Sequence, residues 1–247
     1  MTPRFGVQLH TLREELARDL DDTLAFVAGC GYAGVETAAL HGRSAAAFRS
    51  VLDANGLAAC SAHAMPFGSD AERALDDAQA LGAALVVVPF APPNRFVSAS
   101  SVAALADELN AACALARSRG LRLGYHNHFW EWRVLEDRRL AFDALVARLD
   151  PAVELEIDIY WATTAGRDPS AEIAKHGARV TRLHLKDGPA DKPESPMTAL
   201  GDGVVDLRSA MRAATHADWM LVELDQCAGE IREAVRRSAE WLRGQRH

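Results

Sequence analysis

Short apolar runs alternate along the chain with longer segments that repeat apolar residues at helical spacing. Eight short runs have the apolar and β-branched content of strands, at residues 4–9, 34–37, 57–63, 85–89, 121–126, 153–158, 180–185 and 220–224. Between them, residues 21–30, 45–54, 71–81, 101–119 and 230–242 are rich in Ala, Leu, Glu and Arg and predict helices. This alternation predicts a parallel sheet whose strands are joined by helical crossovers.

Glycine marks the end of several of these helices. Gly31, Gly56, Gly82 and Gly120 each follow a helical segment and precede a strand, as a helix C′ residue does. Eight strands in such units fit a (β/α)8 TIM barrel better than an open doubly wound sheet. The open sheet carries a Gly-x-Gly-x-x-Gly turn after its first strand, and residues 8–11 hold none. We expect one α/β domain, a TIM barrel spanning residues 1–247, with a long loop at 187–206 on the catalytic face.

Composition narrows the possible partners. The 247 residues are 49% apolar and 25% charged, which suits one large globular core. The net charge of −7 disfavours a nucleic-acid surface. Four scattered cysteines suggest neither a zinc ribbon nor a disulfide framework. No segment has the length of a membrane span or the pattern of a signal peptide, so we expect a cytoplasmic protein without a membrane partner.

Residues capable of chemistry stand where the predicted strands end. The fifth strand runs into His126 and His128, which lie two apart and therefore face the same side of extended chain. For either histidine alone, an ordinary hydrogen-bonded loop residue is the simpler interpretation. The other strands end in the same way, and the carboxyl ends of barrel strands carry the active site. The residues at these ends are His10, Glu36, His63, Asp158, His184 and Glu223.

Two of these carboxylates have no place in an apolar core. Asp158 lies within a buried strand, where an unpaired carboxylate costs several kcal/mol and needs a cation; an ion pair or a helix N-cap is the alternative. Glu223 has the same requirement, and Asp225, two residues later, is the alternative for its role. With His184 and His126 they make a mixed nitrogen and oxygen site, which suits Mn²⁺, Zn²⁺, Co²⁺ or Fe²⁺.

A set of short motifs in a fixed order makes the chain resemble a known family. The chain resembles the sugar-phosphate isomerase/epimerase superfamily of xylose isomerase-like TIM barrels over essentially its whole length. The motifs that carry the resemblance are Gly6-Val7-Gln8-Leu9, Gly31-Tyr32-Ala33-Gly34-Val35-Glu36, Tyr125-His126-Asn127-His128-x-x-Glu131, Asp158-x-x-Trp161, Gly166-Arg167-Asp168-Pro169, His184-Leu185-Lys186-Asp187, Gly201-x-Gly203 and Val222-Glu223.

The resemblance implies one divalent metal ion held by residues that end strands five to eight. In this chain they are His126, Asp158, His184 and Glu223. Epimerases of the family carry a glutamate at the strand-five position, and two carboxylates then exchange a proton across the substrate. Here His126 replaces that glutamate, and Trp161 stands where those epimerases often have histidine. The symmetric two-glutamate mechanism is therefore in doubt for this chain.

Three residues are candidates for catalysis. Glu223 is the first candidate for the base that removes a proton next to a carbonyl. Glu131 is the second, with a loop carboxylate paired to Arg133 as the alternative. Lys186 is expected to hold a substrate hydroxyl or a developing oxyanion, oriented by Asp187, and a surface ion pair is the alternative for both.

Other residues are expected to contact the substrate or support the site. His10, His63 and His128 would line the pocket, and Trp161, with Trp130 and Trp132, would offer faces for a sugar ring. For His10 and His63 a hydrogen-bonded core histidine is the alternative, and aromatic residues at such spacing are more often core side chains than binding surfaces. Glu36 would buttress a histidine ligand or pair with an arginine. The aromatic loop at 129–132 could also pack against a second subunit, so a homo-oligomer is possible.

The expected function is a divalent-metal-dependent isomerase or epimerase of a keto-sugar, working through a metal-stabilised enediolate. A lyase or dehydratase that acts on a keto-glycoside or inosose is the close alternative, because it shares that intermediate. An abasic-site endonuclease and a sugar-binding barrel without catalysis are remote alternatives. The small-molecule carbohydrate is expected to be unphosphorylated, although the Gly201-x-Gly203 loop offers backbone N–H groups that a phosphate could use.

Overall fold

The computed structural model describes residues 3–245 as a closed barrel of eight parallel strands. Each strand pairs with the next along the chain, and β8 pairs with β1 to close the sheet. The strands are β1 (Arg4–Gln8), β2 (Gly34–Thr37), β3 (Ala58–His63), β4 (Leu85–Val88), β5 (Arg122–His126), β6 (Glu154–Asp158), β7 (Val180–Leu185) and β8 (Trp219–Val222). All eight predicted strands are confirmed, with ends that shift by at most two residues.

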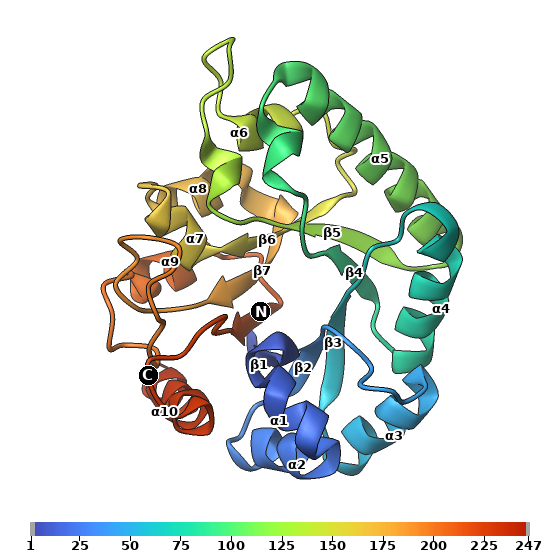
Figure 1. Ribbon diagram of the computed structural model, residues 1–247, viewed down its shortest axis with the longest axis vertical. Helices are drawn as coiled ribbons and strands as arrows, with labels where there is room; N and C mark the ends of the chain where they lie inside the picture. Colours follow the sequence, from blue (N-terminus) through green and yellow to red (C-terminus); the bar gives the residue numbers. More distant parts are fainter. Residues whose placement is uncertain (1–2, 246–247) are drawn as a thin grey trace.

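Helices surround the barrel (Figure 1). The α-helices are α1 (Arg13–Arg18), α2 (Leu20–Gly29), α3 (Ala45–Ala54), α4 (Ala71–Leu81), α5 (Ala99–Ser118), α6 (Ala141–Val146), α7 (Ile159–Thr164), α8 (Pro169–His176), α9 (Leu207–Ala213) and α10 (Ile231–Arg243). Short 3-10 helices are η1 (Leu9–Leu12), η2 (Gly68–Asp70), η3 (Pro93–Phe96), η4 (Trp130–Trp132) and η5 (Gly177–Arg179). The five predicted helices and the positive φ of the four predicted C′ glycines are confirmed.

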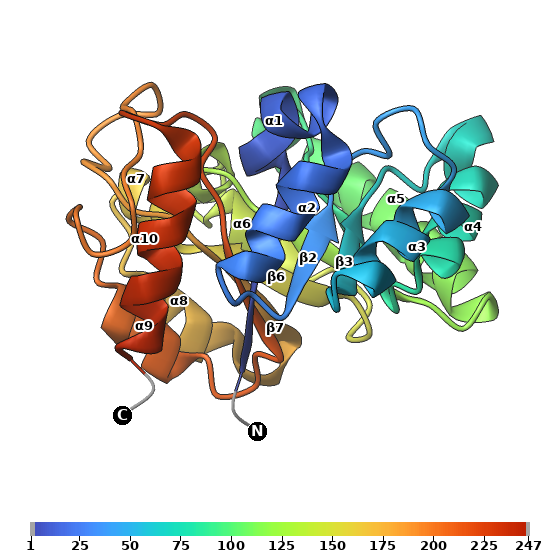
Figure 2. The ribbon, with the colours of Figure 1, turned by 90° about the horizontal axis from the view of Figure 1, so that it is seen from below.

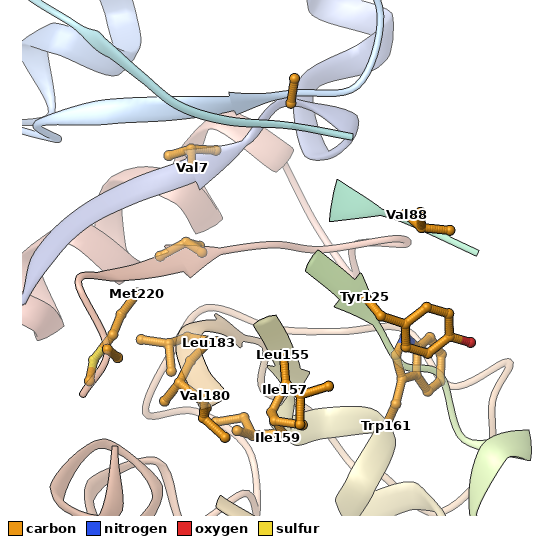
Figure 3. Packing of buried hydrophobic residues seen from close by; sticks show 14 of the residues in the cluster. Val7, Val88, Tyr125, Leu155, Ile157, Ile159, Trp161, Val180, Leu183 and Met220 are labelled. Atoms are coloured by element: carbon orange, nitrogen blue, oxygen red, sulfur yellow. The ribbon is translucent and has the colours of Figure 1, made fainter. Parts of the chain in front are cut away.

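Side-chain alternation divides the buried residues into two sets. Val7, Leu155 and Leu183 belong to the apolar set that packs between the strands and the helices (Figure 3). The residues that alternate with them point into the barrel, because successive side chains of a strand face opposite sides. The buried polar members of that inner set are Gln8, Glu36, Ser61, His126, Glu156, Asp158, Arg182, His184 and Glu223. The polar residues of the barrel therefore meet at its centre.

Aromatic and aliphatic side chains fill the amino-terminal end of the barrel. Trp219 and Leu221 pack with Cys60 in a small separate cluster. The strands leave room for them by carrying glycine: a Cβ on Gly34 would lie 2.8 Å from the Trp219 ring, and one on Gly6 would lie 2.8 Å from Leu221. This apolar plug packs across the amino-terminal end, and the cavity lined by the polar donors opens toward the carboxyl ends of the strands.

The long loop after β7 is confirmed, and Asp187 holds it in place. The Asp187 carboxylate accepts backbone N–H bonds from Gly188 and Val205 at Oδ1 and from Gly201 and Gly203 at Oδ2. Asp187 is buried, so it neither orients Lys186 nor forms a surface ion pair, contrary to expectation. The same bonds consume the N–H groups of Gly201 and Gly203 that a phosphate could have used. Figure 2 places this loop at the same end of the barrel as α1.

The described part of the chain, residues 3–245, contains no helix with the length and apolar character of a membrane span. The four cysteines are free thiols, as expected.

The aromatic loop at residues 129–132 packs largely against its own fold: Trp132 is buried, and the Trp130 indole donates to the Ala91 carbonyl at 3.1 Å. The expected subunit contact of Trp132 is therefore not available.

We expect Gly203→Ala to destabilise the protein through the Asp187 loop. A Cβ at this position would lie 2.1 Å from Asp187 Oδ1 and 2.2 Å from the Gly188 nitrogen. Such overpacking typically costs about 1–3 kcal/mol, and each kcal/mol lowers Tm by about 2–4 °C in a chain of this size. Thermal unfolding followed by circular dichroism measures the change. Gly229→Ala is the matched control, because its Cβ would have no neighbour within 4 Å; equal Tm values for the two variants would contradict the role of Gly203.

Candidate active site

A cavity of about 440 Å³ opens at the carboxyl ends of the strands. Its volume suits a small molecule. Its lining is mainly imidazole, carboxylate and ammonium groups with a short apolar wall, contributed by His10, Ala38, His63, Ala64, Met65, Pro89, Phe90, His126, His128, Lys186, Glu223 and Asp225. Six of these residues were predicted for the site from the sequence: His10, His63, His126, His128, Lys186 and Glu223.

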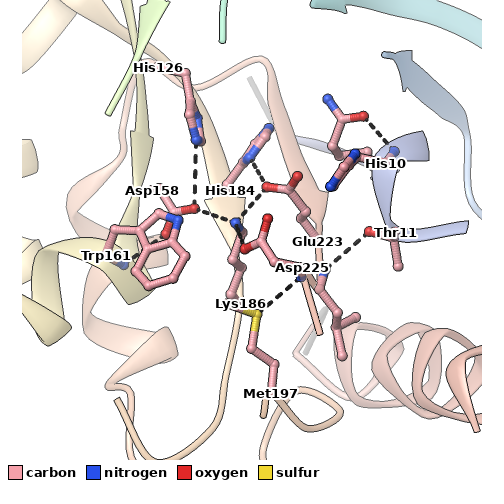
Figure 4. A network of polar contacts seen from close by, with 12 residues as sticks. His10, Thr11, His126, Asp158, Trp161, His184, Lys186, Met197, Glu223 and Asp225 are labelled. Atoms are coloured by element: carbon pink, nitrogen blue, oxygen red, sulfur yellow. Dashed lines mark hydrogen bonds and ion pairs between the residues drawn. The ribbon is translucent and has the colours of Figure 1, made fainter. Parts of the chain in front are cut away.

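Four side chains predicted as metal ligands converge at the floor of this cavity. His126, Asp158, His184 and Glu223 each offer one donor atom, and these atoms lie within 4.8 Å of one another. All four residues are buried, and each comes from the end of a different strand, β5 to β8 (Figure 4). The closing of the barrel brings them together. We call this set the upper quartet.

Asp158 divides its two oxygens between the fold and the upper quartet. Oδ1 accepts the Trp161 backbone N–H at 2.9 Å and caps the N-terminus of α7, so the N-cap interpretation holds for this oxygen. Oδ2 is buried and forms an ion pair with the Lys186 ammonium at 3.0 Å. It lies 3.9 Å from His126 Nε2. A buried carboxylate oxygen beside imidazole nitrogens fits a divalent ion, and the donor set agrees with that assignment.

Lys186 places an ammonium group against the same carboxylates. Its Nζ lies 3.0 Å from Asp158 Oδ2, 2.8 Å from Glu223 Oε2 and 2.5 Å from Asp225 Oδ2. Burial disfavours the charged form, but Asp158, Asp225 and Glu223 outweigh it and raise the pKa of Lys186 well above its ordinary value. The side chain is only 1% exposed, so it is not a surface ion pair. The site therefore holds a hydrogen-bond donor that stays positively charged.

A second group of side chains lies one layer deeper in the barrel. It contains Glu36, His63, Glu156 and His184, and we call it the deep cluster. Glu36 receives hydrogen bonds from Gln8 Nε2 at 2.7 Å and Ser61 Oγ at 2.6 Å. It also lies 2.8 Å from His184 Nε2, which agrees with its expected role in buttressing a histidine ligand. No ion pair joins Glu36 to an arginine among residues 3–245.

The sequence reasoning overlooked Glu156. It is fully buried, and its Oε2 lies 2.8 Å from His63 Nε2, 3.1 Å from His184 Nε2 and 3.3 Å from His126 Nδ1. Burial opposes its ionisation, but His184 and the other imidazoles outweigh burial and lower the pKa of Glu156. Glu156 precedes Asp158 by two residues, so its presence on the inner face of β6 could have been predicted from strand alternation.

Glu131 lies behind the cavity wall. It is fully buried, it is absent from the described lining residues, and its Oε1 accepts the Tyr125 hydroxyl at 3.0 Å. Burial raises the pKa of Glu131 to about 8. No ion pair joins it to Arg133 in the described chain. This position favours support of the strand-five loop over direct contact with a substrate.

Aromatic rings form the side of the site next to β5. His128 lines the cavity and stacks on Trp130 with ring centroids 4.4 Å apart. Burial lowers the pKa of His128 to about 2, so its imidazole is neutral. Trp161 is buried behind Lys186, whose Nζ lies 5.2 Å from the centre of the indole ring. Trp161 therefore supports the lysine and is not among the lining residues.

The fold and the arrangement of polar residues agree with a known family. The family model described as "Xylose isomerase-like TIM barrel" matches residues 24–245. The chain belongs to the xylose isomerase-like TIM barrel family. The family is enzymatic in the relatives that this chain matches, which carry the names of a dehydratase and an epimerase.

Two curated relatives match about half of this chain. An inosose dehydratase from Clostridium beijerinckii is 28% identical over 141 residues, 49% of this chain and 46% of the relative. A 2-epi-5-epi-valiolone 7-phosphate 2-epimerase from Actinoplanes sp. is 33% identical over 137 residues, 54% of this chain and 47% of the relative. The chain thus spans about half the length of the curated relatives it matches.

Solved structures share the whole fold. A sugar phosphate isomerase/epimerase from Parabacteroides distasonis aligns with a TM-score of 0.84 at 22% identity, over 100% of this chain and 96% of the other. The IOLI protein, solved with a zinc atom bound, aligns with a TM-score of 0.71 at 14% identity, over 96% of this chain and 95% of the other. At these identities the likeness concerns the fold.

We expect Glu131→Gln to change how stability depends on pH. Between the ordinary glutamate pKa of 4.5 and about 8, the folded chain holds a proton on Glu131 that the unfolded chain has released. The free energy of unfolding therefore falls as pH rises through this window, by at most about 1.4 kcal/mol per pH unit. The glutamine variant lacks this contribution, so its stability relative to the wild type should rise from pH 5 to pH 8.

Urea unfolding at several pH values between 5 and 8 measures this difference. The exposed Glu194 provides the control, since Glu194→Gln makes the same chemical change at the surface. A constant stability difference between Glu131→Gln and the wild type over the whole range would contradict a protonated Glu131.

Proposed function

We propose that the protein is a divalent-metal-dependent isomerase or epimerase of a small keto-sugar. The observation that carries the proposal is the meeting of four potential metal ligands, a carboxylate base and a charged lysine at the floor of one cavity. The name of the epimerase relative and the zinc atom in the IOLI structure support the proposal. We infer that the reaction begins with removal of a proton next to the substrate carbonyl.

The upper quartet of His126, Asp158, His184 and Glu223 would hold one ion, for which Mn²⁺, Zn²⁺ and Co²⁺ suit the donors. Bound there, the ion would act as a Lewis acid toward substrate oxygens and favour an enediolate. Asp158 Oδ2, which the helix cap does not use and which faces His126 and Lys186, is the clearest position for a ligand atom.

Glu223 is the proposed base. It lines the cavity, and each of its ion pairs in the described chain uses Oε2, which leaves Oε1 for a substrate proton. Burial opposes its ionisation, but Lys186 and His184 outweigh burial and hold the pKa of Glu223 well below its ordinary value. Glu223 is therefore ionised and able to accept a proton when the enzyme meets its substrate.

Lys186 is proposed to donate to the oxygen on which negative charge develops. Its ammonium lies 2.8 Å from Glu223, so one substrate can reach the proton acceptor and the donor together. A preorganised charged donor of this kind typically contributes about 10²–10³-fold in rate. We propose a supporting role for Glu131, which leaves Glu223 as the base.

The remaining residues are proposed to position the substrate. His10, His63 and His128 would bind hydroxyl groups through their ring nitrogens, and Trp161 would act through Lys186. Phe90 and Met65 supply the apolar wall. No arginine is among the described lining residues, and the loop N–H groups are bonded to Asp187. These features favour an unphosphorylated carbohydrate.

Dehydration is the second candidate function. Elimination of water needs a base for the carbon-bound proton and a proton for the departing hydroxyl. Glu223 would take the carbon-bound proton and return it to the departing hydroxyl, while the Lys186 ammonium, 2.8 Å from Glu223, would stabilise the developing negative charge. The replacement of the epimerase glutamate by His126 removes the carboxylate that a symmetric epimerase would use on the opposite face. The name of the inosose dehydratase relative supports this candidate. The net negative charge of the chain disfavours the DNA binding that an abasic-site endonuclease needs. The four potential metal ligands of the upper quartet disfavour a purely sugar-binding role, which has no need of them.

Incubation with ketohexoses and an inosose in D₂O tests the proton-transfer step. We expect deuterium next to the carbonyl in recovered sugar, detected by NMR, and a rate at least about 100-fold lower for Glu223→Gln. Asp225→Asn, which alters the neighbouring carboxylate, should retain exchange. Loss of one water from the product by mass spectrometry would identify a dehydratase. Turnover of one of these substrates without any exchange would overturn the enolate step.

Removal of divalent ions tests the cofactor. Dialysis against a chelator should abolish deuterium exchange, because no ion would then remain in the upper quartet to stabilise negative charge on the substrate. Addition of Mn²⁺, Zn²⁺ or Co²⁺ should restore it. Unchanged exchange in protein that elemental analysis finds free of metal would contradict the dependence on an ion.

A further inference from the structure

A separate cavity lies at the opposite end of the barrel from the candidate active site. Its volume is about 350 Å³, which suits a small molecule. It is lined by residues at or next to the beginnings of several strands, and three of them are arginines. Arg4 begins β1, Arg122 begins β5 and Arg182 lies within β7. We call this cavity the arginine pocket.

The register of the strands places two of these arginines beside one tryptophan. Trp219 of β8 pairs with Arg4 of β1 on one side and with Arg182 of β7 on the other. The Arg4 guanidinium lies 4.2 Å from the centre of the Trp219 ring, and its Nη2 donates to the Ala33 carbonyl at 3.4 Å. A cation over an indole face is attracted to it. Arg4 is therefore held at the pocket, although it is an exposed residue.

Arg182 carries a buried charge that the protein compensates only in part. The residue is 2% exposed, and its guanidinium donates to the Cys60 carbonyl at 3.0 Å and to the Thr181 hydroxyl at 3.4 Å. Its one ion pair within residues 3–245 is a distant one, in which Glu154 Oε2 lies 4.0 Å from Nη1. Its Nε has no hydrogen-bond partner in the described chain. A buried charge without close compensation is costly, so an anion beside Arg182 would be stabilising.

Glu154 is shared among several partners and does not neutralise the pocket. Its Oε1 accepts Arg122 Nη1 at 2.8 Å, and its Oε2 accepts the Thr181 hydroxyl at 2.5 Å. The Nε and Nη2 groups of Arg122 make no hydrogen bond in the described part of the chain. Guanidinium donors from Arg122 are therefore still available to a ligand.

The pocket has more positive than negative charge. Asp218 is the one acidic residue among its described lining residues; it is exposed, and no ion pair joins it to an arginine within residues 3–245. Three guanidinium groups thus accompany two carboxylates, those of Asp218 and Glu154, in a chain whose net charge is −7. This local excess of positive charge favours an anionic ligand.

We propose that the arginine pocket binds a phosphate group, as inorganic phosphate or as part of a small phosphomonoester. A guanidinium group presents its N–H donors in a planar fork that matches the oxygens of phosphate. A tetrahedral oxyanion directs its oxygens to several sides, so it can accept from arginines that belong to three different strands. The site goes beyond the proposed function, because the upper quartet and its cavity lie at the carboxyl ends of the strands.

Crystals of the wild-type protein soaked in sodium tungstate test the position of the site. Tungstate has the shape and charge of a phosphate dianion, and its tungsten atom gives a strong anomalous signal. We expect an anomalous peak in the arginine pocket, with oxygens about 2.7–2.9 Å from guanidinium nitrogens of at least two of Arg4, Arg122 and Arg182. No peak in this pocket would overturn the proposal.

Calorimetric titration with inorganic phosphate, at an ionic strength held constant with sodium chloride, tests the arginines. Arg122→Gln should weaken binding by about 10-fold or more, because it removes a charged donor. Arg148→Gln is the matched control: Arg148 is exposed, lies outside the pocket, and its side chain makes no hydrogen bond or ion pair in the described chain. It should bind phosphate like the wild type. Equal affinity of wild type and folded Arg122→Gln, with folding verified by circular dichroism, would overturn the proposal.

The same titration with glucose 6-phosphate separates the two sources of the phosphate group. Tighter binding than that of inorganic phosphate would assign the pocket to a phosphomonoester, and weaker binding would assign it to the free ion. Arg122→Gln should weaken whichever ligand binds. Deuterium exchange at the active site should persist in Arg122→Gln, so loss of phosphate binding is distinguishable from failure of the proposed function.

Discussion

The interior of this barrel is built around buried carboxylates that need positive charge beside them. Glu36, Glu156, Asp158 and Glu223 project inward from β2, β6 and the end of β8, and three imidazoles and one ammonium group accompany them. Removal of one partner from a buried ion pair typically costs about 3–5 kcal/mol, since it leaves a charge without compensation. Each inward residue is therefore constrained by residues on other strands. The polar interior is stable only as a set.

This constraint explains the division of the fold into layers. Trp219 and Leu221 form an apolar plug across the amino-terminal end of the barrel. The deep cluster lies above this plug, and the upper quartet lies above the deep cluster at the floor of the cavity. The cavity reaches the upper quartet and, at one point, His63 of the deep cluster. Charges that could not be left unpaired in the core are thus concentrated where chemistry is possible.

Lys186 and His126 give the site its asymmetric distribution of charge. Lys186 contacts three carboxylates and stays charged, so the site holds a strong donor next to the proposed base. In the proposed metal site His126 would be a neutral donor, because burial and the nearby His184 lower its pKa. The proposed chemistry is consequently asymmetric, with acid and base on the side of β7 and β8. The loop that follows β7 is held separately by Asp187, so the carboxylate next in sequence to Lys186 serves the fold.

Much of this organisation follows from local patterns in the sequence. Apolar periodicity located the strands and the principal helices, and C′ glycines marked where helices end, because these features depend on neighbours within a few residues. Alternation also placed Asp158 and His184 on inner faces. The same rule places Glu156, two residues before Asp158, on the inner face. Alternation does not tell how far below the cavity an inward side chain lies.

Only the tertiary structure decided which charges meet. His184 and Glu36 are 148 positions apart in the sequence and 2.8 Å apart in the barrel, because closure of the sheet brings β2 and β7 to one centre. Closure of the sheet also decides that Glu131 lies behind the cavity wall, that Asp187 binds loop N–H groups, and that three carboxylates surround Lys186. Sequence spacing determined the types and faces of the polar residues. Their partners, their burial and hence their ionisation were set by contacts across the barrel, which no local pattern records.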